Sequence, residues 1–196
     1  AAAWELERGG SGIAIVLGAA TALAVTPGGW PRVGVAAAFT LGASALAPVA
    51  LVVALRTRWP TDSEREGVAD VLGDYRLRIV DDRTRVGSAL AAGLLPGARY
   101  VFLTESVLAT LDDEEVRAVV AHEVGHHERG HVLLRSVAVA VLAGAVLALV
   151  EVAPGLALVV LAVGAVPAAA AFAWVVRTTE RRADAYAARA VGGRAL

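Results

Sequence analysis

Four long stretches without a charged residue constrain what this chain of 196 residues can fold into. Gly9 to Pro31 and Val33 to Leu55 each run for 23 residues, and Val152 to Val176 runs for 25. A helix rises about 1.5 Å per residue, so each of these stretches can cross a hydrocarbon core of about 30 Å. The remaining stretch, Ser136 to Val150, is shorter and spans if its flanking charged residues reach the headgroups.

The composition favours a membrane protein over a soluble bundle of very apolar helices. Hydrophobic residues make up 57% of the chain and charged residues only 19%, whereas soluble domains are nearer half and a quarter. A net charge of −1 argues against a nucleic-acid partner. Cysteine is absent, which excludes disulfides and Cys-ligated metals. Methionine is also absent, so we expect a processed chain or a fragment.

The order of the four stretches predicts a topology. Turns rich in Pro and Gly join the first two stretches and the last two, so the chain returns to its starting side after each pair. A cleaved signal peptide fits the first stretch poorly, because a second spanning stretch follows after a tight turn. The opposite side carries Arg32 alone; the starting side carries Arg8, Arg56, Arg58, Arg129, Arg135, Arg177, Arg181 and Arg182. The positive-inside rule therefore predicts a multi-pass cell-membrane protein whose polar part and both termini are cytoplasmic.

We expect four segments and one small sheet. A loop with a capped helix, starting at Thr61, Asp62 or Ser63, precedes three short strands predicted at Tyr75 to Val80, Arg85 to Ala91 and Arg99 to Thr104. The fold class is a mainly α membrane protein with four transmembrane helices and an α+β domain. Its segments are a transmembrane hairpin (1–56), a cytoplasmic domain (57–135), a second transmembrane hairpin (136–176) and a C-terminal helix (177–196).

A metal-binding pattern lies in the cytoplasmic domain, within His122-Glu-Val-Gly-His126. Asp112 with Glu115 reads as an N-cap and capping box, which predicts a helix. Positions four apart share a helix face, so both imidazoles can bind one metal ion. Glu123 would lie beside the open position and take a proton from the attacking water. The alternative is a surface helix with solvated histidines.

A catalytic zinc ion normally has three protein ligands, so one is missing from this pair. Glu151 is expected on the wrong side of the membrane, whereas Glu180 follows the last uncharged stretch as it returns. Asp184 is one helical turn further and could hydrogen-bond a ligating histidine. The alternative is that Glu180 and Asp184 are ordinary charges on a juxtamembrane helix.

The pattern HEVGH, followed by two spans and then RTTERRAD, resembles the integral-membrane zinc metalloprotease family that contains the HtpX heat-shock protease and the type 1 CAAX prenyl protease. That family's signature is H-E-x-x-H with a later E-x-x-A-D. The segments GSALAAGLLPGARYVFLTESVL and TLDDEEVRAVVAHEVGHHERGH are also similar to it, and the four-span layout is similar to the HtpX branch. The resemblance implies a zincin-like domain holding one Zn²⁺ on His122, His126 and Glu180, with Glu123 as general base.

Two departures from the family pattern carry expectations. Ser88-Ala89 stands where members often have Asn-Ala, so we expect altered contacts near the metal. The chain ends at Leu196, soon after E-x-x-A-D, where the family usually continues, so we expect helices that wall the cleft to be missing.

The resemblance implies a membrane-embedded zinc metalloendopeptidase that acts in quality control on membrane or misfolded proteins at the cytoplasmic face. Its expected partners are membrane-associated protein or peptide substrates and the lipid bilayer. The second predicted strand, through Ser88, Ala89 and Leu90, could pair with an extended substrate if it lies at a sheet edge. Its weak alternation fits a buried core strand equally well.

Other assignments near the motif stay open. Arg177 and His131 are candidate donors to a transition-state oxyanion. His127 and His131 form a second pair four residues apart, rotated about 100° from the first, for which a solvated or membrane-proximal pair is favoured over a second metal site.

Three alternative functions remain. The first is a catalytically inactive membrane scaffold with a structural zinc, for which His127 or Asp184 would be the fourth ligand. The second is a CAAX-type prenyl-protein protease. The third is an intramembrane protease, against which the charged residues around the motif argue.

Overall fold

The computed structural model describes residues 26, 28–81 and 87–192. They form two compact units. The helical unit comprises the described residues up to Ser44 together with Leu134–Arg177, and the sheet unit comprises Ala45–Leu133 together with the described residues from Thr178. The predicted division into four sequence segments stays a prediction.

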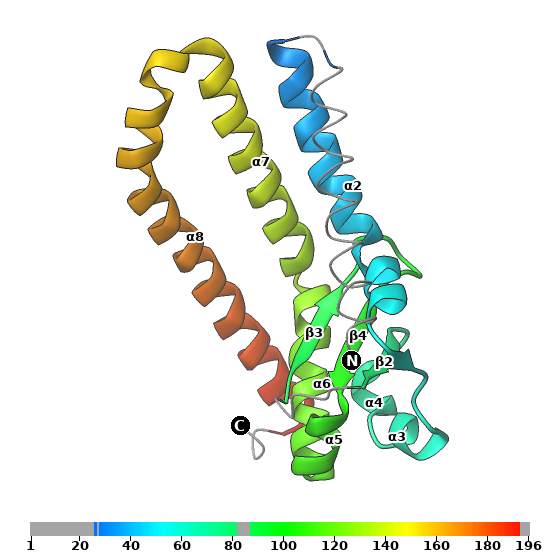
Figure 1. The fold of residues 1–196 in the computed structure, drawn as a ribbon. Coiled ribbons are helices and arrows are strands. Elements are labelled where there is room, and N and C mark those ends of the chain that lie inside the picture. The colour runs from blue at the N-terminus through cyan, green and yellow to red at the C-terminus, as the bar shows by residue number, and fades with distance from the viewer. Residues whose placement is uncertain (1–25, 27, 82–86, 193–196) are drawn as a thin grey trace. The chain divides into compact units, whose positions relative to one another are not determined.

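Three long helices carry the uncharged stretches: α2 (Trp30–Ala54), α7 (His131–Val152) and α8 (Pro154–Ala190) (Figure 1). Each is long and apolar enough to cross a membrane, and they are the three such helices among the described residues. Gly9 to Pro31, the predicted first span, lies almost entirely outside those residues, so a total of four spans stays a prediction. The C-terminal segment is no separate helix, because α8 continues through it to Ala190.

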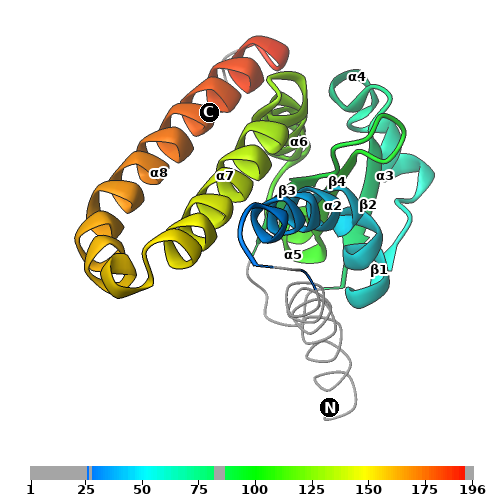
Figure 2. The same cartoon turned by 90° about the horizontal axis from the view of Figure 1, so that it is seen from above.

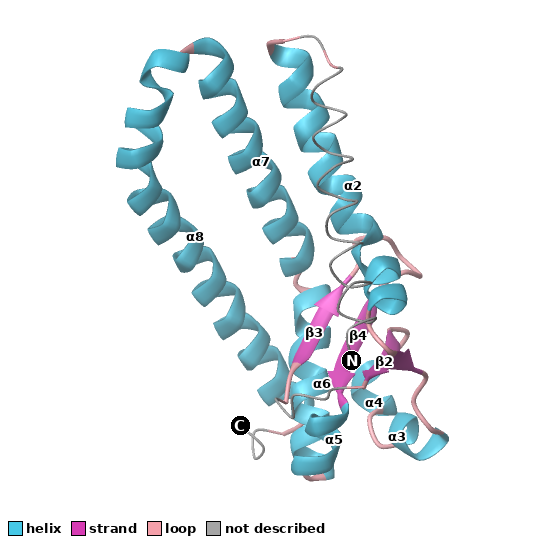
Figure 3. Ribbon diagram, viewed as in Figure 1, coloured by secondary structure: helices cyan, strands magenta, loops and turns pink. Residues whose placement is uncertain are grey.

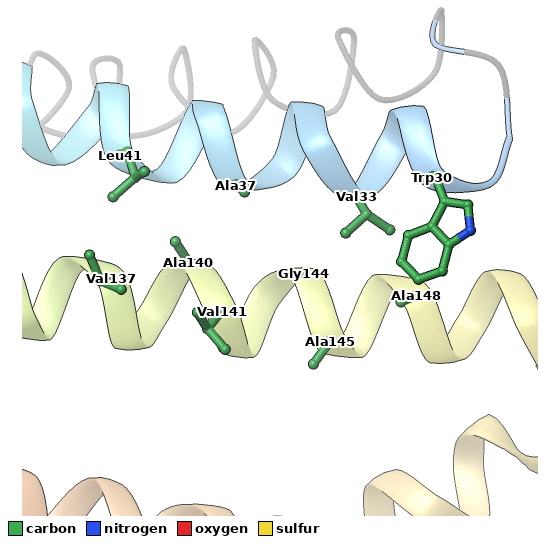
Figure 4. A pocket seen from close by; sticks show the side chains of 10 residues that line it. All are labelled: Trp30, Val33, Ala37, Leu41, Val137, Ala140, Val141, Gly144, Ala145 and Ala148. Atoms are coloured by element: carbon green, nitrogen blue, oxygen red, sulfur yellow. The ribbon is translucent and has the colours of Figure 1, made fainter.

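Within the helical unit, an ion pair joins the start of α2 to the end of α7. The Arg32 guanidinium lies 2.9 Å from the Glu151 carboxylate, which also accepts a hydrogen bond of 3.0 Å from the Gly29 backbone N–H. The two helices are therefore antiparallel, as the predicted topology requires. Figure 4 shows the facing sides of α2 and α7. They line an apolar pocket of about 340 Å³, where Ala140, Gly144 and Ala148 provide the four-residue spacing of small side chains that is common at helix contacts in membranes.

The sheet unit contains all four described strands (Figure 3). Their order is β1-β2-β4-β3, as Figure 2 shows from above. β2 and β4 are parallel, and the two outer strands pair antiparallel with their neighbours. The strands are β1 (Thr57–Arg58), β2 (Arg76–Val80), β3 (Ala89–Ala92) and β4 (Tyr100–Thr104). The strands predicted at Tyr75 to Val80 and Arg99 to Thr104 are confirmed to within one residue. The strand predicted at Arg85 to Ala91 is confirmed only from Ala89 onward, and its first two residues lie outside the described residues. Among the described strands β3 lies at an edge, and the two-residue β1 was not predicted.

Short helices and their caps complete the sheet unit. Thr61 and Asp112 each make a full capping box, with Glu64 and Glu115 respectively, so both predicted helix starts are confirmed. The helices are α3 (Asp62–Glu66), α4 (Ala69–Leu72), α5 (Glu105–Thr110) and α6 (Asp113–Glu128).

A hydrophobic core fixes α6 to the sheet. Ile79 of β2, Val101 and Leu103 of β4, and Val120 and Ala121 of α6 are all fully buried in it. Burial of each Val, Leu or Ile side chain among them stabilises the fold by about 1.5–3 kcal/mol. The helix that carries the metal-binding pattern is therefore held rigidly by its opposite face.

Candidate metal centre

The two histidines of the pattern lie one turn apart on α6 and point the same nitrogen at one another. His126 Nε2 is 3.1 Å from His122 Nε2. His126 is buried and His122 is half-buried. This is the shared helix face that the spacing predicts.

Glu180 reaches the same point from α8. Its Oε2 lies 3.2 Å from His122 Nε2 and 3.6 Å from His126 Nε2. The three ligand atoms lie within 4.8 Å of one another. Tetrahedral zinc with bonds of about 2.0–2.2 Å separates its ligand atoms by about 3.3–3.6 Å. Two imidazoles and one carboxylate at these separations therefore fit a zinc ion.

The outer nitrogens of both rings are engaged elsewhere. His122 Nδ1 lies 2.9 Å from Asp184 Oδ1, where an imidazole N–H donates to the carboxylate. His126 Nδ1 lies 3.2 Å from His131 Nδ1. Such contacts orient the rings of metal-binding histidines and select their tautomer. With each Nδ1 so engaged, the Nε2 atoms are the ones left to face a metal.

Small residues let α8 approach α6. A Cβ added at Gly125 would lie only 3.1–3.2 Å from three atoms of Tyr186 on α8. Ala183 and Ala187, one turn apart on α8, are fully buried. This contact was not predicted, although a glycine within the motif and alanines four residues apart are a sequence signal for close helix packing. The contact matters because it lies on the helix that carries Glu180.

The predicted placement of His127 and His131 on one helix face is wrong. α6 ends at Glu128, Gly130 takes a φ of +66°, and His131 begins α7, so the two histidines share no helix face. His127 stacks on Tyr75 with ring centroids 5.0 Å apart, its Nε2 lies 3.1 Å from the Tyr100 carbonyl oxygen, and burial lowers its pKa. His131 is 1% exposed, so neither histidine is solvated.

The other predicted site residues lie either on the helices α6 and α8 or at the edge strand β3. Glu123 lies on α6 next to His122 and is 9% exposed, while Arg177 is an exposed residue of α8 three positions before Glu180. Ser88 precedes the edge strand β3, and its backbone N–H donates to Thr104 Oγ1 at 3.0 Å. α6 packs against β3, where Ala89 lies against the hydrophobic core and Leu90 is exposed. Their roles in catalysis stay predictions.

Comparison with known families decides what kind of protein carries this centre. The sequence model of peptidase family M48 matches residues 67–195, which is more than half of the chain. The chain belongs to peptidase family M48. The matched residues include every member of the candidate centre, from both α6 and α8.

Relatives within the M48 family are HtpX-like. A Protease HtpX homolog of Pyrococcus abyssi is 41% identical over 70 residues, which are 36% of this chain and 24% of that protein. The homolog of Pyrococcus furiosus is 36% identical over 88 residues, 45% of this chain and 30% of that protein. That of Persephonella marina is 37% identical over 70 residues, 36% of this chain and 24% of that protein. The alignments thus span less than a third of these relatives.

Proposed function

We propose that the chain is a zinc metalloendopeptidase that hydrolyses peptide bonds of membrane or misfolded proteins at the cytoplasmic face of the cell membrane. One observation carries the proposal. Two imidazole nitrogens, from His122 and His126, converge with a carboxylate oxygen of Glu180 from a different helix. Membership of a peptidase family supports the same activity.

His122, His126 and Glu180 would hold the zinc. Bound zinc would polarise the scissile carbonyl and make water at the site more acidic. Glu123, adjacent to His122 on α6, would accept the proton of the water as its oxygen attacks the carbonyl carbon. The same carboxyl would then return the proton to the amine nitrogen as the carbon–nitrogen bond breaks.

The edge strand β3 would bind the substrate backbone. Among the described residues it pairs with β4 alone, so its other side would offer the N–H and C=O groups that an extended peptide can bind. Backbone pairing of this kind depends little on side-chain identity, which suits a protease that removes misfolded proteins. Ser88, Ala89 and Leu90 would be the residues next to the peptide.

The cytoplasmic location rests on charge and on the apolar helices. In the predicted topology, arginines gather on the side of the spanning stretches that carries His122, His126 and Glu180. Three helices long and apolar enough to cross a membrane support a membrane location. A site close to the membrane would meet tethered substrates at a high effective concentration.

A structural zinc scaffold is the weaker candidate, because it needs a fourth protein ligand. His127 turns away to the Tyr100 carbonyl, and Asp184 contacts the outer nitrogen of His122. Neither predicted fourth ligand points at the centre among the described residues, so a position would be left for water and substrate.

The proposed activity is tested by comparing Glu123→Gln with the wild type in detergent. Both should bind about one zinc ion per chain. The variant should cleave casein about 10²–10⁴-fold more slowly, because it lacks the proton acceptor. The matched control is Glu128→Gln. Glu128 lies on the same helix and accepts a hydrogen bond from the Tyr75 hydroxyl, so this variant should keep activity. Equal cleavage by Glu123→Gln and the wild type would remove Glu123 from this role.

A further inference from the structure

The turn that joins β3 to β4 is rigid and apolar. No charged residue lies between Arg85 and Arg99. The Ala98 backbone N–H donates to the Leu95 carbonyl at 3.0 Å across Pro96 and Gly97, and Gly97 has a φ of +77°. Pro followed by Gly at positive φ is the arrangement of a type II turn. Leu95 is 55% exposed at this turn. Exposure of an apolar side chain to water does not stabilise the fold.

The base of the turn lies against α2. Gly93 has a φ of +111°, and a Cβ there would clash with the Ala98 carbonyl oxygen and lie 3.0 Å from Pro48 Cγ. Of the residues of α2, all of which are described, Pro48 alone is buried. Figure 1 shows the turn beside the end of α2 that is nearest the sheet. The turn is therefore in contact with a helix able to span a membrane.

The position of Pro48 in α2 gives the depth of this contact. Pro48 comes eight residues before Arg56, the first charged residue after the apolar stretch. At about 1.5 Å per residue, Pro48 lies about 12 Å from the level of Arg56. A hydrocarbon core is about 30 Å thick, so this depth falls within one leaflet. Val49 and Val53, exposed on the same part of α2, would face the same acyl chains.

The two flanks of the turn differ. Pro96 and Gly97 border a cavity of about 520 Å³ whose lining includes Asp70, Asp74, Arg99 and Glu128. This flank suits the headgroup layer, where charged groups and water are available. Leu95 is not among the residues that line this cavity, and its apolar side chain is exposed.

We propose that the turn Leu94–Gly97 inserts into the leaflet on the side of Arg56, with Leu95 among phospholipid acyl chains. The inference rests on the membrane location in the proposed function and deepens it. The C-terminal end of β3 leads into this turn, so the edge strand would lie directly beside the bilayer surface. Substrates that pair with it would then be extended segments directly adjoining a transmembrane helix.

The absence of cysteine makes a direct test possible. Leu95→Cys, Val53→Cys and Glu66→Cys are each labelled with the environment-sensitive fluorophore NBD and reconstituted into phosphatidylcholine vesicles. All three positions are exposed, so the substitutions leave the core intact. Val53 on α2 reports the spanning helix, and Glu66 on α3 reports a water-facing position. Quenching by nitroxides on acyl chains is compared with quenching by aqueous iodide.

The label at Leu95 should lose emission to the acyl-chain nitroxides as the label at Val53 does, and iodide should quench neither of them. A Leu95 label that follows Glu66, while Val53 is quenched from the lipid, overturns insertion of the turn and leaves the proposed function standing. If the lipid nitroxides do not quench the Val53 label either, both the membrane location and the insertion of the turn are contradicted.

Discussion

Single ring nitrogens decide what the candidate centre can bind. Asp184 holds the outer nitrogen of His122 at 2.9 Å, so that the inner nitrogen faces His126 and Glu180. Removing a carboxylate that orients a metal-binding histidine typically lowers metal affinity about 10–100-fold. Asp184→Ala should therefore lose zinc affinity by that factor in competition with a chelator. Asp74→Ala is the control, and equal affinity in the two variants would mean that Asp184 does not orient the ring.

The ion pair between Arg58 and Glu64 should make the stability of the fold depend on pH in acid. Arg58 donates two hydrogen bonds of 2.8 Å to Glu64, and this contact lowers the pKa of Glu64 to about 2 from 4.5. Between these pH values the unfolded chain binds more protons, so stability falls as pH drops from about 4.5 to 2. The pair is solvent-exposed, so its contribution is about 1 kcal/mol or less.

Thermal melts of the wild type and Glu64→Gln from pH 6 to pH 2 would check this. The variant keeps a side chain able to accept from the Thr61 N–H, so the cap survives. Its melting temperature should fall less steeply below pH 4.5 than that of the wild type. Parallel curves would show that the Arg58 contact adds no stability.

Close packing of two helices, α6 and α8, brings the third ligand to the histidines. In Gly125→Ala the new Cβ would crowd the Tyr186 ring, which lies 3.1–3.2 Å away. Overpacking costs about 1–3 kcal/mol, against a gain in helix propensity of about 1 kcal/mol. The variant should melt at a lower temperature. Adding Tyr186→Ala should make the Gly125→Ala change harmless, whereas an undiminished penalty in that background would exclude the contact as its cause.

The elements that the sequence predicts well are those with local signals. The start of α6 follows from Asp112 and Glu115, and the histidine pair follows from the helical period. The strands β2 and β4 follow from their branched and aromatic residues. Glu180 was suggested by chain order, because it is the acidic residue that follows the last uncharged stretch, and by the resemblance of RTTERRAD to the family signature.

The failures of prediction have tertiary causes. His131 pairs with His126 because the chain turns at Gly130, and a positive φ there cannot be read from spacing. His127 is buried against Tyr75, which lies on a segment far away in sequence. The edge position of β3 depends on the order in which strands pair, which a strand's own alternation does not encode. β1 has two residues, too few to form any pattern.

At the scale of the whole molecule, α2 and α8 each contribute residues to both compact units. Glu180 thus lies on the helix whose first part carries an apolar stretch long enough to span a membrane. Residues 67–195, which match peptidase family M48, likewise include the apolar helices α7 and α8 together with the sheet unit. The apolar helices and the candidate metal ligands therefore lie in one continuous stretch of sequence.

Zinc content is the most direct test of whether His122, His126 and Glu180 form one centre. After dialysis, the wild type and Glu66→Ala should each retain about one zinc ion per chain. Glu180→Ala should lose it under the same conditions, because only two protein ligands remain. Full retention of zinc by Glu180→Ala, with unchanged affinity, would contradict the proposed centre.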